Sequence, residues 1–237
     1  QKKKKTNKKE SGALDMKETL SNSEAFYNKN KKAILIVLSA IIILIAGLLI
    51  YKAYYAGPRE EKASTALAKG QEYFNMEQFD KALNGDSTGY TGFIRIISDY
   101  SGTDAANLAN LYAGLSCANL NKWNDAVKYL EAYSPSDDAM VSPAAVAALG
   151  NAYAQIGEVD KAVKNLKDAA KMADSRSEAK ANMSISPTFL IQAGELLESQ
   201  GKKSDALKIY QDIKTKYVNS PVVQNSEIDK YIERVSE

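Results

Sequence analysis

The chain of 237 residues contains no histidine, one cysteine and five prolines. Without histidine there is no zincin motif, no Ser-His-Asp or Cys-His catalytic set and no histidine-ligated haem. A single cysteine, Cys117, excludes an internal disulfide, a cysteine-based zinc site and an iron–sulfur cluster. These absences exclude several enzyme classes, while 45% hydrophobic residues are enough to form a core.

The chain has 31 basic and 29 acidic residues, but the two signs of charge are distributed unevenly along it. Residues 1–32 hold ten lysines and four acids, a net charge of +6, whereas residues 58–237 hold 20 basic and 25 acidic residues, a net charge of −5. The segment between them adds only Lys52. A basic segment such as 1–32 binds either anionic lipid or nucleic acid, and the segment that follows it decides between these partners.

That following segment, residues 33–51, is apolar and carries no charge. At about 1.5 Å per residue, a helix of this length matches the hydrocarbon core of a bilayer, about 30 Å thick. A core helix rarely stays apolar on every face for five turns. A cleaved signal would have a shorter apolar region and a small residue where Tyr54 stands. We therefore predict a retained transmembrane helix over residues 33–55, in contact with membrane lipid.

The charges that flank this helix predict its orientation. The lysines before it outweigh Lys52 and Arg59 after it, and Arg59 is countered by Glu60 and Glu61. The positive-inside rule then places residues 1–32 in the cytoplasm as a basic tail and the larger domain on the other side. In this position the tail lysines contact anionic headgroups, and nucleic acid is not expected as a partner.

After a helix break expected at Gly57-Pro58, the chain repeats one helical pattern four times. In every unit a Gly and an Ala stand 12 residues apart, and a large or apolar residue follows the Gly by three. Small residues at both positions let the two helices of a hairpin approach closely, and such hairpins bury their apolar faces only by stacking. The pattern predicts an all-α solenoid. The Gly/Ala pairs are Gly70/Ala82, Gly114/Ala126, Gly150/Ala162 and Gly194/Ala206.

These units resemble the tetratricopeptide repeat, with about four repeats over residues 58–223. The middle interval of 36 residues between glycines is close to the 34-residue period, whereas the outer two intervals are 44. We assign the excess to a glycine-rich insertion at 84–92, interpreted as a surface loop that lengthens one hairpin, and to a polar connector at 174–186. Residues 224–237 are expected to form a C-terminal capping helix.

No part of the chain has the residue spacing of an active site. The insertion at 84–92 lacks the Lys-Ser/Thr ending of a nucleotide loop and the spacing of a calcium loop. We expect Cys117 to be a buried side chain of a repeat helix, and Asp137-Asp138 to lie in a polar connector that does not raise a carboxyl pKa. We therefore predict no catalytic residue, no metal site, no cofactor and no enzyme activity.

The resemblance to tetratricopeptide repeats implies a partner-binding groove lined by the first helix of each repeat. Repeat proteins that grip a C-terminal carboxylate carry Lys and Arg in this groove, whereas Leu67, Ala144 and Ala148 stand at those places here, so no such clamp is expected. An apolar groove edged by Asn and Gln suits an amphipathic helix or an extended apolar segment. The alternative is that several of the leucines pack between repeats. The groove residues are Leu67, Gln71, Phe74, Leu108, Leu111, Leu115, Asn119, Ala147, Asn151, Gln155, Ile191, Glu195 and Glu198.

The basic tail, the single span and the repeat domain together resemble the YfgM-type inner-membrane proteins, in a Bacteroidota-like version. These proteins are ancillary to the Sec translocon and contact periplasmic chaperones. The resemblance implies a single-pass protein of the cell inner membrane with a cytoplasmic N-terminus and a periplasmic repeat domain. It also implies protein partners among translocon subunits, secretory clients and chaperones. The alternative is a structural organiser of envelope assembly or cell division that self-associates through its repeats. The missing carboxylate clamp argues against a mitochondrial import receptor.

Overall fold

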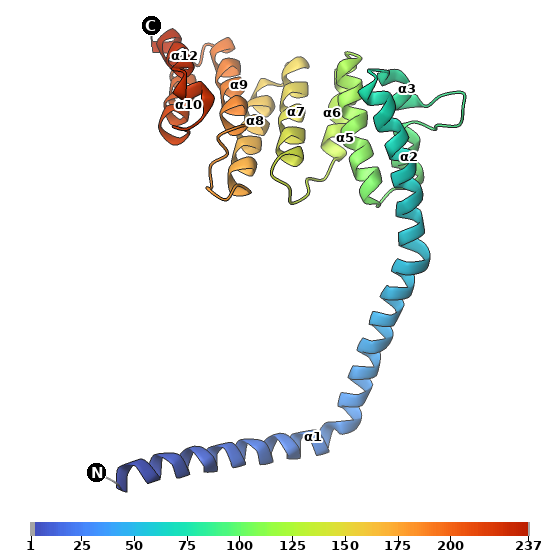
Figure 1. Ribbon diagram of the computed structural model, residues 1–237, viewed down its shortest axis with the longest axis vertical. Coiled ribbons are helices and arrows are strands. Elements are labelled where there is room, and N and C mark those ends of the chain that lie inside the picture. Colours follow the sequence, from blue (N-terminus) through green and yellow to red (C-terminus); the bar gives the residue numbers. More distant parts are fainter. Residues whose placement is uncertain (1–2, 237) are drawn as a thin grey trace. The chain divides into compact units, whose positions relative to one another are not determined.

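The computed structural model describes the backbone of residues 3–236 and the side chains of residues 26–236. The chain divides into two compact units, Gln1–Pro58 and Arg59–Glu237, which are treated separately below. Every regular element within the described backbone is helical, so the predicted all-α class is confirmed (Figure 1).

The first unit contains α1 (Lys3–Tyr51) and a short π-helical turn, η1 (Lys52–Ala56). The aliphatic side chains of α1 project outward, with Ile36 69% exposed and Ile43 72% exposed. In the described part of the chain, one helical segment, Phe26–Asn75, is long and apolar enough to span a bilayer, and its best window has a mean hydropathy of 3.3. The side chains of the basic tail before Phe26 lie outside the described residues.

The helix break expected at Gly57-Pro58 is wrong, because the backbone stays helical at this point. Gly57 has φ −60° and ψ −56°, and its N–H donates to the carbonyl of Lys52, five residues back. Pro58 has no N–H and would leave a carbonyl in the preceding turn without its donor. Pro58 directly follows the π turn of η1 and is the second residue of α2 (Gly57–Asn75).

The second unit is a row of stacked helical hairpins (Figure 1). The pairs α5–α6, α7–α8 and α9–α10 each pack together, and contacts of α6 with α7 and of α8 with α9 join successive hairpins. Two apolar clusters form a core along this row, one from Ala63 to Ala162 and the other from Ala147 to Val235. Beyond α2, the helices are α3 (Phe79–Asn84), α4 (Phe93–Asp99), α5 (Asp104–Asn119), α6 (Trp123–Ala132), α7 (Val141–Gln155), α8 (Val159–Ser175), α9 (Ser186–Ser199), α10 (Lys203–Lys216), α11 (Pro221–Gln224) and α12 (Glu227–Ser236).

The Gly–Ala spacing has the packing role that it predicts. A Cβ atom built on Gly114 would lie 2.5 Å from Cγ of Leu130, and one on Gly150 would lie 3.0 Å from Cγ of Leu166. Each leucine stands four residues after the alanine of its repeat. The alanines of all four repeats have no exposed surface. In the last three repeats, the missing side chain at the glycine is therefore the space that a large residue of the second helix occupies.

In the first repeat, the insertion supplies this large residue. The Asp86 carboxylate accepts hydrogen bonds from the backbone N–H groups of Thr88 (2.8 Å) and Tyr90 (3.0 Å), which makes a tight turn. Tyr90 is directed inward, its hydroxyl donates to the carbonyl of Ala82 at 2.8 Å, and its ring covers Gly70. The insertion at 84–92 is thus a surface loop, as expected, with Ser87, Thr88 and Gly89 exposed. Its Tyr90 is in addition anchored in the core of the first hairpin, which the spacing did not indicate.

The C-terminal end of the stack is covered by α12. This helix begins at Glu227, three residues later than residue 224, because Ser226 adopts φ 55° and separates it from α11. Ile228 and Val235 are buried against the second apolar cluster, and α12 packs on α10. Glu237 lies outside the described residues.

Candidate partner-binding face

The thirteen groove residues predicted from the repeat pattern lie on α2, α5, α7 and α9, the first helix of each hairpin. Their exposure separates them into three groups. Leu67, Leu111 and Ala147 are buried, with 5%, 6% and 3% of their surface exposed. The exposed residues are all polar, and the half-buried residues include both apolar and polar side chains. The exposed residues are Asn119, Asn151, Gln155 and Glu195, and the half-buried residues are Gln71, Phe74, Leu108, Leu115, Ile191 and Glu198.

The three buried residues belong to the core and do not reach a partner. Each stands three residues before the glycine of its repeat, on the side of the helix that packs against neighbouring elements. A leucine at this position contributes to stacking of the hairpins, about 1.5–3 kcal/mol for a fully buried side chain. The equivalent residue of the fourth repeat, Ile191, is half-buried and packs against the second cluster.

The half-buried apolar residues are partly used within the fold. The ring of Phe74 meets those of Phe79 and Tyr112 edge-on, with centroid distances of 5.3 and 5.2 Å. Leu108 and Leu115 pack against the first apolar cluster. The accessible part of this surface is therefore a set of amide side chains between partly covered apolar ones. We call the exposed and half-buried residues of the predicted set the first-helix face.

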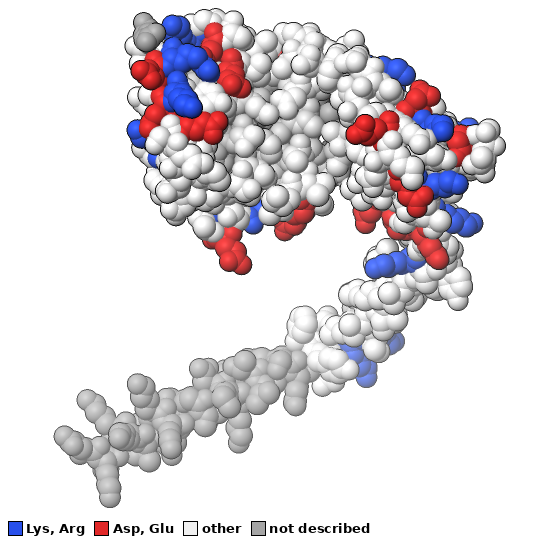
Figure 2. Space-filling view, turned by 45° about the horizontal axis from the view of Figure 1, so that its top comes forward, with Lys and Arg blue, Asp and Glu red and all other residues white. Residues whose placement is uncertain are grey.

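The first-helix face is nearly free of charge. The ten residues of the face include two acids, Glu195 and Glu198, and no lysine or arginine. Helices α5, α7 and α9 contain no lysine or arginine at all, whereas α2 carries its basic residues outside the face. On the side seen in Figure 2, charged side chains gather at the two ends of the repeat unit and are sparse between them. Such a surface has no cation to balance a carboxylate or phosphate, so it favours hydrogen bonding to uncharged groups of a polypeptide.

Glu198 is already bound within the chain. Arg234 of α12 donates to its carboxylate from Nε at 2.8 Å and from Nη2 at 2.7 Å, and the hydroxyl of Tyr210 donates to the same group. The hydrogen bond from Arg234 holds the pKa of Glu198 below its ordinary value, against the opposing effect of burial. The carboxylate of Glu198 is thus occupied by the capping helix, whereas Glu195 of the same helix stays exposed.

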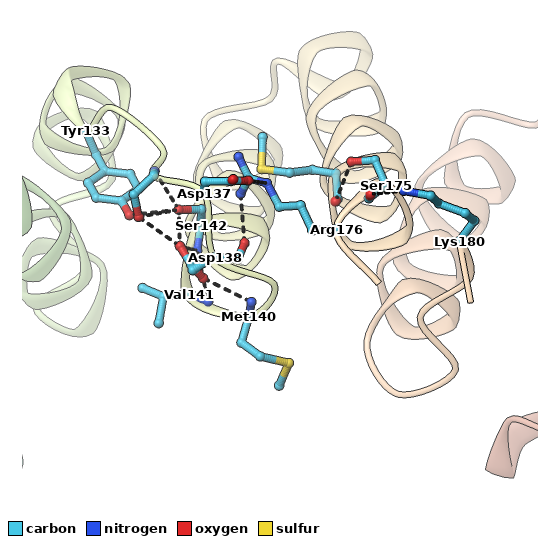
Figure 3. Close-up of polar contacts among 11 residues, drawn as sticks. Tyr133, Asp137, Asp138, Met140, Val141, Ser142, Ser175, Arg176 and Lys180 are labelled. Atoms are coloured by element: carbon cyan, nitrogen blue, oxygen red, sulfur yellow. Dashed lines mark hydrogen bonds and ion pairs between the residues drawn. The ribbon is translucent and has the colours of Figure 1, made fainter. Parts of the chain in front are cut away.

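Of the two neighbouring carboxylates, Asp138 is structural, whereas Asp137 is fully exposed and lies 3.6 Å from Arg176. The Asp138 carboxylate accepts hydrogen bonds from the backbone N–H groups of Met140 (3.0 Å) and Ser142 (3.1 Å) and so caps the start of α7 (Figure 3). Burial opposes ionisation of Asp138, but these hydrogen bonds and that of the Ser142 hydroxyl lower its pKa. Arg176 donates to the carbonyl of Asp138 at 2.9 Å, which ties this connector to the end of α8. A carboxylate that stays ionised in this way does not exchange protons near neutral pH.

Cys117 is 1% exposed on α5, and burial raises the pKa of its thiol to about 11, with a further contribution from Asp125. A thiol of this kind is an inert core side chain. Among the described residues, no group of three or more His, Cys, Asp or Glu side chains is placed to hold a metal ion.

One surface feature was not predicted from the sequence pattern. A furrow of about 580 Å³ runs between α8 and α10, and lysines of α8 line one of its walls. The sequence signal that could have indicated it is the helical spacing of Lys164, Lys167 and Lys171, of which Lys167 and Lys171 line the furrow.

The comparisons agree with this architecture. The model of the tetratricopeptide repeat-like domain family matches residues 24–225, and the chain belongs to this family. Two solved structures share the fold: the TPR-like repeats of a candidate kinesin light chain from Podosopora anserina and a single-substitution variant of the same protein. Both have a TM-score of 0.52 and 13% identity, covering 75% of this chain and 94% of the other. No curated protein matches the sequence. Repeats of this kind form scaffolds for protein–protein interaction and are typically non-catalytic.

Proposed function

We propose that the protein is a membrane-anchored, non-enzymatic scaffold of the cell inner membrane. Its repeat domain binds other proteins on the periplasmic side and assists the trafficking or folding of secreted or envelope proteins at the Sec translocon. The observation that carries this proposal is the combination, in one chain, of an interaction domain and an outward-facing apolar helix. The family match begins at residue 24 and so includes the apolar helix together with the repeats.

The anchor is supported by the exposure of the apolar side chains of α1. None of the residues in its most apolar window is buried within the fold. Each large aliphatic side chain left in water forgoes about 1.5–3 kcal/mol of transfer free energy, which a bilayer would recover. Extraction of membranes with alkaline carbonate tests this point. We expect the protein to stay in the membrane pellet, and Ile43→Arg with Leu44→Arg to release it, since each arginine costs about 2.5–3.5 kcal/mol at the centre of a span.

The orientation is supported by Lys29, Lys31 and Lys32, which are basic residues at the start of the apolar run. We test it by placing a cysteine at Ser23 or at Thr65 and treating spheroplasts with a membrane-impermeant maleimide. We expect labelling at position 65 in intact spheroplasts and at position 23 only after lysis. The reverse pattern would reject the periplasmic location.

The partner is tested by photocrosslinking from the first-helix face. Asn119 and Asn151 are suitable positions because both side chains are exposed, whereas Leu111 is buried in the core. We expect crosslinks to secretory chains, translocon subunits or periplasmic chaperones, and fewer from Lys128 on α6 as a matched surface position. Crosslinks only to a second copy of the chain would favour the structural organiser. Absence of any crosslink at Asn119 and Asn151 in the membrane-integrated protein would reject binding through this face.

A further inference from the structure

The furrow between α8 and α10 is separate from the first-helix face. A second depression of about 370 Å³ adjoins it, and both are lined by Lys167, Leu190 and Asp212, so the two form one continuous channel. We propose that this furrow binds an acidic amphipathic helix of a protein partner. The proposal rests on the floor, the length and the charge of the furrow, and it does not depend on the partner of the first-helix face.

The floor of the furrow is apolar. Leu190 and Leu197 of α9 lie between the two flanking helices, and Val163 and Ile209 line the walls beside them. Val163 and Leu190 are only half-buried, so their side chains are accessible from the furrow. An apolar floor between two helices is the surface on which an amphipathic helix places its own apolar side.

The length of the furrow also fits a helix. Along α8 the lining residues extend from Val163 to Ser175. At 1.5 Å per residue this is about 18 Å, or roughly three helical turns. A small anion would occupy only a fraction of this length, whereas a helix of about 12 residues would fill it.

The charge of the rim determines the sign of the partner. Lys167 and Lys171 of α8 line the furrow, and within the described residues neither forms an ion pair with a carboxylate. Lys180 lines it from the connector, and its Nζ donates to the carbonyl of Ser175 at 3.1 Å. The furrow is thus lined by three lysines that form no ion pair with a described carboxylate. It is lined by one acidic residue, Asp212, that forms no ion pair with a described lysine or arginine.

The other carboxylates at the furrow are neutralised by their neighbours. Asp174 pairs with Lys216, and Asp205 lies 3.1 Å from Lys208. Asp168 lies 2.7 Å from Lys164. The excess of free lysines therefore attracts glutamates and aspartates on the solvent side of a docked helix, and a basic helix would be repelled.

The test uses the full chain in nanodiscs of neutral lipid and three synthetic 14-residue helical peptides. All three carry leucines at i, i+3, i+4 and i+7, and their opposite faces carry only Glu, only Gln or only Lys. Binding is measured by fluorescence anisotropy, with empty nanodiscs as the blank. We expect the Glu peptide to bind at least about tenfold more tightly than the Gln peptide, and the Lys peptide not to bind.

Two variants locate the binding. Lys167→Glu with Lys171→Glu should weaken binding of the Glu peptide at least about tenfold and allow the Lys peptide to bind, while Lys128→Glu on α6 should change neither. Leu190→Ser should weaken both the Glu peptide and the Gln peptide without altering their order. Circular dichroism of each variant confirms that the fold is retained.

Two outcomes would overturn the proposal. One is equal binding of the three peptides, and the other is binding of the Glu peptide that survives the charge reversal. Flotation with anionic vesicles provides the further comparison. If vesicles bind through Lys167 and Lys171 while the Glu peptide does not bind, the furrow is a lipid site and the protein partner is rejected.

Discussion

Arg234 of the last helix holds Glu198 of α9 by two parallel hydrogen bonds of 2.8 and 2.7 Å, across 36 residues of sequence. The pair joins the capping helix to the first helix of the fourth repeat. It also removes from the first-helix face a carboxylate that the repeat pattern assigns to partner binding.

The first prediction concerns this pair. Because Arg234 is half exposed, we expect Arg234→Met to lower the free energy of unfolding by only about 1 kcal/mol at neutral pH, measured by urea denaturation. The pair lowers the pKa of Glu198, so its stabilisation is complete above the ordinary glutamate value of 4.5 and is lost as pH falls through the lowered pKa. A double-mutant cycle with Glu198→Gln should therefore give a coupling energy that disappears in acid. A coupling that grows in acid would contradict this assignment.

The second prediction concerns the repeat glycines. A Gly→Ala change inside a helix ordinarily stabilises a protein by about 0.5–1 kcal/mol. At Gly114 we expect a loss of about 1–3 kcal/mol instead, because the new Cβ would overlap Leu130. Gly150→Ala should be close to neutral, since its Cβ would stand 3.0 Å from Leu166. In a Leu130→Ala background, Gly114→Ala should become neutral or stabilising; an unchanged penalty would show that Leu130 is not the cause.

The third prediction concerns Asp174, which is 6% exposed and joins the end of α8 to the end of α10. Its carboxylate accepts hydrogen bonds from the hydroxyls of Tyr217 and Ser186, both at 2.7 Å, and from the N–H of Asn182 at 2.8 Å, and it pairs with Lys216. We expect Asp174→Asn to lower the free energy of unfolding by about 2–4 kcal/mol, because the substitution leaves buried donors without their acceptor.

The matched control for Asp174 is Asp168→Asn on the same helix. Asp168 pairs with Lys164 on an exposed surface, so this change should cost less than about 1 kcal/mol. Thermal unfolding followed by circular dichroism compares the two. Equal costs would mean that the buried network does not hold the two helix ends together.

The fourth prediction concerns Cys117. Because burial raises its pKa to about 11 and covers the sulfur, we expect no alkylation of the folded protein by a maleimide at pH 8 and one adduct after unfolding in urea. Intact mass spectrometry provides the measurement. Rapid labelling of the folded chain would show that α5 opens locally. The inert thiol also leaves an introduced cysteine at position 23 or 65 as the reactive one.

The repeat arrangement follows from the sequence because its signals are local. The 12-residue spacing from Gly114 to Ala126 spans the short turn between two helices that pack together. The recurring large residues three and four positions away follow helix periodicity, which places them on the same face. The same is true of the apolar run of residues 33–51, whose length and composition need no tertiary information. A local expectation that failed is the break at Gly57-Pro58, where the backbone stays helical through a π turn.

The candidate sites depend on contacts between residues far apart in the chain, and no periodicity specifies these. A repeat pattern assigns Leu111 to the first helix, but only packing decides that its side chain enters the core. Nothing in the spacing indicates that Tyr90 fills the space over Gly70. The sequence by itself therefore determined the class of fold and the apolar helix, through side chains that share a helix face. The tertiary structure alone decided which of those side chains remain free to bind, because burial and ion pairing depend on what the neighbouring hairpin places opposite them.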